Sequence, residues 1–173
     1  MAYSRNFRNR MSNDQGQLFE RLIDQACWYY RNKGLAMIEK TPEPFRVKRI
    51  NKDNTFTGWF TGNAQPDYKG TVHGGRALVF EAKFTSKDRI KKSVVTGNQA
   101  ACLDIYEEMG ALVGVCCMIG KTAAFIPWGD WKQMKELFGR QYLLESELVE
   151  EYQVPTPGYI DFLHFIKQEE RNV

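Results

Sequence analysis

The first third of the chain changes from a helical to a β-type pattern of apolar residues. Residues 12–34 carry one apolar face at helical spacing, preceded by the N-cap types Ser12-Asn13-Asp14 and ended by Gly34. The members of this face are Phe19, Leu22, Ile23, Ala26, Cys27 and Tyr30. The pattern predicts an amphipathic helix, followed by short strands at 35–38, 45–50 and 55–61 that are bounded by Pro, Asn and Asp.

The rest of the chain alternates β-type and helical segments. Two apolar runs around a glycine-rich turn predict a β-hairpin over 66–83. A helix is expected at about 98–109, strands at 111–119 and 122–126, and a helix after Pro127 that carries Trp131, Met134 and Phe138. This order favours a mixed α/β sheet flanked by helices.

Asp67, Glu81 and Lys83 are the candidate catalytic residues. In the predicted hairpin Asp67 lies on the first strand, while Glu81 and Lys83 point to the same side of the second. Two carboxylates and an ammonium suit metal-dependent phosphodiester cleavage, because Mg²⁺ prefers oxygen ligands and a cation can position the attacking water. A solvated surface or a structural ion pair is the alternative, but the apolar run before Glu81 indicates burial.

Composition narrows the class of protein. The 173 residues suffice for one domain with a core, expected over 12–173, and Arg5, Arg8 and Arg10 predict a flexible basic arm over 1–11. The absence of a membrane-length apolar run favours a cytoplasmic protein. The four cysteines lack metal or disulfide spacing and are expected to be reduced core residues. The net charge is only +3, but basic residues cluster before the hairpin, which suits a polyanion.

Several short motifs occur in order along the chain. They are Gly16 with Phe19-Glu20, Lys40-Thr41-Pro42, Asp67-Tyr68-Lys69-Gly70, Phe80-Glu81-Ala82-Lys83 and Gln99. Together they resemble the RecU-type Holliday junction resolvases, which are PD-(D/E)xK nucleases. The resemblance covers about residues 12–127 and implies a restriction-endonuclease-like fold with a protruding β-hairpin stalk at about 43–62.

The resemblance also implies the chemistry and the partners. Asp67 and Glu81 would be ligands of Mg²⁺, for which Mn²⁺ could substitute, and Glu20 would complete the metal shell. Lys83 would assist the attacking water, and Gln99 would hold a water or a phosphate. From sequence alone, a solvated helix-start acid is the preferred interpretation of Glu20, and Gln99 is equally a polar first-turn residue. The expected DNA-binding residues are Lys40, Arg46, Lys48, Arg49, Lys52 and Lys69.

The function implied is that of a homodimeric endodeoxyribonuclease that nicks a four-way DNA junction symmetrically in recombination and repair. Two alternatives stay open: a PD-(D/E)xK nuclease acting on other branched or duplex DNA, and a DNA-binding relative that does not cleave. In the stalk, strand alternation predicts Arg46 and Lys48 on one face and Arg49 on the other. The aromatic residues of the stalk could serve base stacking or dimer packing.

Overall fold

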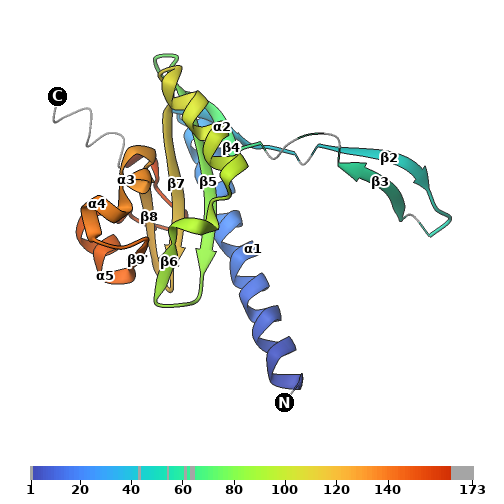
Figure 1. The fold of residues 1–173 in the computed structure, drawn as a ribbon. Helices are drawn as coiled ribbons and strands as arrows, with labels where there is room; N and C mark the ends of the chain where they lie inside the picture. Colours follow the sequence, from blue (N-terminus) through green and yellow to red (C-terminus); the bar gives the residue numbers. More distant parts are fainter. Residues whose placement is uncertain (1, 43, 54, 61, 63–64, 165–173) are drawn as a thin grey trace.

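A mixed five-stranded sheet forms the centre of the protein. The computed structural model describes residues 2–42, 44–53, 55–60, 62 and 65–164 (Figure 1). The strands, in chain order, are β1 (Ala36–Lys40), β4 (Tyr68–Val72), β5 (Ala77–Thr85), β7 (Leu112–Ile119) and β8 (Thr122–Pro127). They lie in the order β1-β4-β5-β7-β8, with β5 and β7 parallel and the other neighbours antiparallel. The predicted mixed α/β sheet flanked by helices, with a protruding hairpin, is confirmed.

Helices cover both faces of this sheet. α1 (Ala2–Asn32) packs on one face, where Phe19 and Tyr30 join Phe80 and Phe162 in a core of aromatic rings. α2 (Gly97–Glu108), α3 (Trp128–Lys132) and α4 (Met134–Phe138) belong to the core of the other face. Both faces of β5 are therefore buried, as its long apolar run requires.

The N-terminal boundary of α1 was predicted wrongly. The helix begins at Ala2 and not at Ser12, so residues 2–11 have helical backbone in place of a separate irregular arm. No Pro or Gly interrupts the chain between Ala2 and Gln15, so the helix continues through the N-cap types Ser12-Asn13-Asp14. The flexibility of this basic segment and the division of the chain into arm and domain stay predictions.

The β-hairpin formed by β2 (Phe45–Ile50) and β3 (Phe56–Phe60), here called the stalk hairpin, projects from the body of the protein (Figure 1). In the part of the chain that the structure describes, its two strands pair only with each other. Arg46 lies opposite Trp59 and Arg49 opposite Thr57, and Lys48 is an extra residue at a β-bulge.

The bulge changes the expected faces of the hairpin. Trp59 and Thr57 are two residues apart on a regular strand, so their partners Arg46 and Arg49 share a face. The prediction that these two arginines point to opposite faces was wrong, because the extra residue shifts the alternation by one position. The other face is apolar, and there the rings of Phe45 and Phe56 contact each other at 5.4 Å between centroids.

Two smaller features complete the fold. β6 (Arg89–Lys91) pairs with β9 (Tyr142–Leu144) in an antiparallel ribbon that the sequence did not predict. Short helical segments follow the adjacent strands: η1 (Lys92–Val94), α5 (Glu145–Glu147) and η2 (Leu148–Tyr152). Among the described residues, no helix combines the length and the apolar character needed to cross a membrane.

Candidate active site

The hairpin of β4 and β5 positions the three candidate catalytic residues. Its turn is tight because Gly74 and Gly75 both adopt a φ of +93°, which favours glycine. Glu81 and Lys83 lie on the same face of β5, as predicted. Asp67 precedes β4 by one residue and so is not on the strand itself. Its carbonyl oxygen nevertheless accepts a hydrogen bond from the Thr41 amide at 2.8 Å, which fixes the backbone there.

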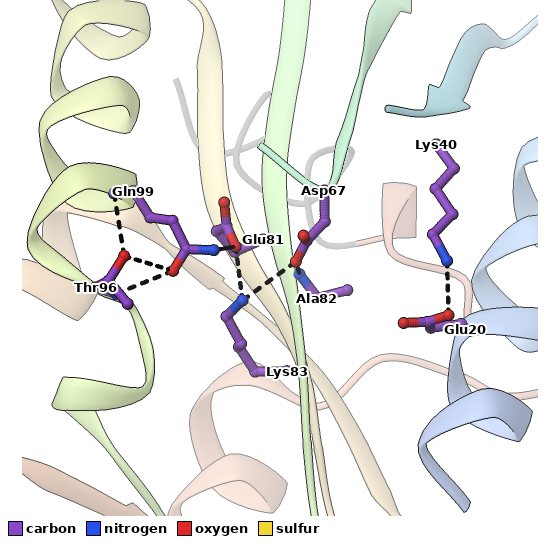
Figure 2. A network of polar contacts seen from close by, with 8 residues as sticks. All are labelled: Glu20, Lys40, Asp67, Glu81, Ala82, Lys83, Thr96 and Gln99. Atoms are coloured by element: carbon purple, nitrogen blue, oxygen red, sulfur yellow. Dashed lines mark hydrogen bonds and ion pairs between the residues drawn. The ribbon is translucent and has the colours of Figure 1, made fainter. Parts of the chain in front are cut away.

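Lys83 joins the two carboxylates (Figure 2). Its Nζ donates to Glu81 Oε2 at 2.7 Å and to Asp67 Oδ2 at 3.2 Å. The amide of Ala82 also donates to Asp67 Oδ2, at 2.9 Å. Two strand segments are thus held together through one ammonium group and one backbone amide. Asp67, Glu81 and Lys83 are called the carboxylate-lysine cluster below.

Gln99 connects the cluster to the start of α2. Its Nε2 donates to Glu81 Oε2 at 2.5 Å, and its Oε1 accepts from the amide and the hydroxyl of Thr96, each at 3.0 Å. The Thr96 hydroxyl in turn accepts from the Gln99 amide, which completes a capping box. Both ends of the Gln99 side chain are therefore engaged. Thr96 was missed in the sequence, although the T-x-x-Q spacing before a helix signals such a box.

Burial dominates the electrostatics of the cluster. Glu81 is 0% exposed, and its Oε1 has no hydrogen-bond partner among the described residues. Burial raises the pKa of Glu81 to about 7, and the charge of Asp67 acts in the same direction, while Lys83 opposes both. For Lys83, burial lowers the pKa, but the carboxylates of Asp67 and Glu81 outweigh it and raise the pKa above the ordinary value. Lys83 is therefore a cation at neutral pH.

The donor set of the cluster fits a hard divalent cation. Asp67 and Glu81 supply two carboxylates, and the buried Glu81 Oε1 is an oxygen for which the described protein offers no partner. Mg²⁺ commonly takes one or two carboxylates and fills its other positions with water and substrate phosphate. Within the described ranges, no group of three or more His, Cys, Asp or Glu side chains is arranged as a complete metal site. Any ion held here would depend on water and substrate for its remaining ligands.

Glu20 lies apart from the other acids. It accepts a hydrogen bond from Lys40 Nζ at 2.7 Å, and both side chains are nearly half exposed. In the view of Figure 2, Asp67 lies between this pair and the Glu81–Lys83 pair. The Glu20 hydrogen bond raises the pKa of Lys40, and the charge of Asp67 contributes to the same shift. A metal-shell role for Glu20 stays a prediction.

The other predicted DNA-binding residues fall into two groups. Lys69 lies on β4, and its Nζ donates to Gln65 Oε1 at 2.7 Å in an exposed contact. The remaining four belong to the stalk hairpin and the turn after β2, and all are exposed: Arg46, Lys48, Arg49 and Lys52. The structure therefore separates a basic hairpin from the partly buried carboxylate-lysine cluster, and the assignment of DNA contacts stays a prediction.

Comparison with known proteins identifies relatives of the chain. The Recombination protein U (RecU) family matches residues 14–168. A Bacillus pumilus protein named "Holliday junction resolvase RecU" is 26% identical over 165 residues, which is 90% of this chain and 80% of that protein. A Streptococcus sanguinis protein of the same name is 34% identical over 98 residues, which is 54% of this chain but only 44% of the relative. A solved structure of Hjc, a Holliday junction resolvase of Archaeoglobus fulgidus, matches with a TM-score of 0.42 and 16% identity, over 66% of this chain and 74% of that one.

Proposed function

The chain belongs to the RecU family, and from this premise we propose that it is a structure-selective endodeoxyribonuclease that resolves Holliday junctions by paired, Mg²⁺-dependent nicks. The curated relatives carry the name Holliday junction resolvase. The enzyme would act in DNA recombination and repair, in the cytoplasm.

One observation carries the proposal: strand β5 and the residue before β4 bring Asp67, Glu81 and Lys83 together around a buried carboxylate oxygen that has no partner among the described residues. An ion pair that served only stability would be expected to satisfy its buried acceptors, since an unpaired buried oxygen costs about 1–3 kcal/mol. A site kept ready for a cation and a substrate explains why this oxygen is left open. The arrangement thus favours a catalytic over a purely structural cluster.

Each residue has a role that follows from its contacts. Asp67 and Glu81 would hold Mg²⁺, which when bound supplies Lewis-acid polarisation of the phosphodiester and a more acidic water. Lys83 places a positive charge beside both carboxylates, where it can orient the attacking water and stabilise charge that develops on the phosphate. Gln99 holds Glu81 in place through its amide, and Thr96 fixes the orientation of that amide.

Junction recognition is assigned to the stalk hairpin, with a homodimer as the active species. The hairpin presents exposed Arg46 and Arg49 on one face and stands away from the sheet (Figure 1). A projecting basic element can reach phosphates of several DNA arms at an open junction, whereas a linear duplex offers it fewer. Two symmetric nicks require two equivalent active sites, which a two-fold dimer provides.

The experiment that tests this function is a cleavage assay on a synthetic four-way junction and a linear duplex of matched sequence, with and without Mg²⁺. We expect paired nicks in the junction only with the metal, and a mass in sedimentation equilibrium equal to two chains. Equal cleavage of the duplex would replace the junction resolvase with a general PD-(D/E)xK nuclease. Metal-independent binding without any cleavage would indicate a relative that binds DNA but does not cut it.

A further inference from the structure

A basic cavity of about 390 Å³ lies next to the catalytic strand but outside the carboxylate-lysine cluster. Its lining residues are Thr85, Lys87, Arg89, Ile90, Lys91 and Val94. Three of these six are cationic, and none is acidic. The volume exceeds the roughly 30 Å³ share of a single water many times over, so a phosphate group and its hydration would fit.

The segment that lines the cavity runs from Thr85 to Val94, and the chain on either side of it leads to residues of the carboxylate-lysine cluster or their partners. Thr85 follows Lys83 by two residues on β5, so both side chains lie on the same face of the strand, roughly 7 Å apart along it. After the cavity the chain returns to Gln99, which donates to Glu81 at 2.5 Å. A group bound in the cavity would therefore be held at a fixed distance from the catalytic carboxylates.

The three cationic side chains around the cavity differ in whether they form ion pairs. Arg89 forms a bidentate ion pair with Asp88, at 3.0 and 2.9 Å, and its guanidinium lies 5.0 Å from the ring centroid of Tyr142 on the paired strand β9. Lys87 and Lys91 are exposed, and within the described part of the chain neither ammonium group has an ion-pair or hydrogen-bond partner. Two ammonium groups without an ion-pair or hydrogen-bond partner among the described residues thus border one hollow. The hydrogen bond from Arg89 lowers the pKa of Asp88, and the Lys87 charge contributes to the same shift.

We propose that this cavity is a second phosphate-binding site, in which Lys87 and Lys91 hold a backbone phosphate that neighbours the scissile phosphate of the same DNA strand. Arg89, oriented by Asp88 and Tyr142, forms the wall of the site. The inference rests on the proposed nuclease function, because it places the DNA strand beside the half-buried end of β5, on the side that carries Lys83 and Thr85. By fixing the position of the DNA strand, the site would determine which phosphate lies at the metal, without recognising any base.

The test compares DNA binding by the wild type and by Lys87→Ala/Lys91→Ala, without metal, across a series of salt concentrations. We expect weaker binding to duplex and junction alike, and a slope of log affinity against log salt that is smaller by about 0.9, because the two lysines together hold one phosphate. Lys87→Arg/Lys91→Arg, which keeps both charges, should keep the slope. Arg31→Ala/Lys33→Ala is the matched control, since it removes two exposed charges at the far end of α1.

A neutral methylphosphonate placed at single positions on either side of the cut makes the test specific. At one neighbouring position it should weaken binding by the wild type and have no effect on Lys87→Ala/Lys91→Ala. An unchanged salt slope in that variant, a change matched by the Arg31/Lys33 control, or equal sensitivity of both proteins at every position would overturn the proposal. These readouts need no cleavage, so a wild type that binds DNA but fails to cut junctions would refute the proposed function and leave this site standing.

Discussion

Glu81 and the arginines of the stalk hairpin occupy opposite kinds of environment. Glu81 is 0% exposed, lies on a strand covered on both faces, and is held by Lys83 and Gln99. Arg46 and Arg49 are exposed on a two-stranded hairpin whose strands pair only with each other. The cluster is thus preorganised by the core, whereas the hairpin can change without disturbing it. Cleavage and junction recognition should therefore separate under mutation.

The largest expected effect comes from Glu81→Gln or Asp67→Asn. Each variant keeps the size of the side chain but removes the charge of a proposed metal ligand, so cleavage with Mg²⁺ should fall on the order of 10³-fold. Junction binding in metal-free buffer should stay near that of the wild type, because phosphate contacts are assigned elsewhere. Single-turnover cleavage and gel-shift titration check both expectations, and wild-type cleavage by either variant would remove the active-site assignment.

A smaller loss of cleavage rate is expected for Lys83→Met, which keeps the length of the side chain but removes its charge. Cleavage should fall about 10²-fold, since the ammonium that stabilises charge near the phosphate is gone. The Mg²⁺ concentration for half-maximal cleavage should change less than in Asp67→Asn. Measuring rate against Mg²⁺ for both variants separates the two roles, and a wild-type rate for Lys83→Met would make Lys83 a structural ion-pair partner only.

Substitutions in the stalk hairpin should change the affinity for the junction but not the rate of cleavage. Arg46→Ala/Arg49→Ala should weaken junction binding roughly 30-fold, at about 1 kcal/mol for each charged contact. The rate at saturating protein should stay close to that of the wild type, because the carboxylate-lysine cluster is untouched. Val47→Thr/Ile50→Thr, on the opposite and apolar face, is the control. If the control loses as much junction affinity as the arginine variant, the face assignment is wrong.

The smallest effect concerns pH. Burial raises the pKa of Glu81 to about 7, so its proton must leave before a metal binds. Mg²⁺ affinity should therefore fall about tenfold between pH 8 and pH 6. The free energy of unfolding should change with pH in the opposite direction. Because the pKa of Glu81 is higher in the folded than in the unfolded state, its contribution to stability is present in acid and is lost as pH rises through about 7. Thermal unfolding without metal should show this trend in the wild type and not in Glu81→Gln.

The sequence predicted the sheet and the cluster because their signals are local. Alternation along β5 put Glu81 and Lys83 on one face, and the apolar run before them predicted the burial. The pairing of β6 with β9 joins segments some 50 residues apart, and no local pattern announces it. The bulge at Lys48 was not predicted for another reason. One additional residue leaves the composition of the strand unchanged, but it moves the side chain of every following residue to the other face.

The side chain of Gln99 connects the first turn of α2 to the carboxylate of Glu81. Its side-chain oxygen completes the capping box that begins α2, and its side-chain nitrogen restrains Glu81. Any event that unwinds the first turn of α2 therefore also removes one of the two side-chain hydrogen bonds to the buried carboxylate, and the Lys83 hydrogen bond alone remains. Amide hydrogen exchange at the start of this helix would consequently report on how firmly Glu81 is held in the proposed catalytic centre. A ligand that slows exchange there should alter cleavage without entering that site.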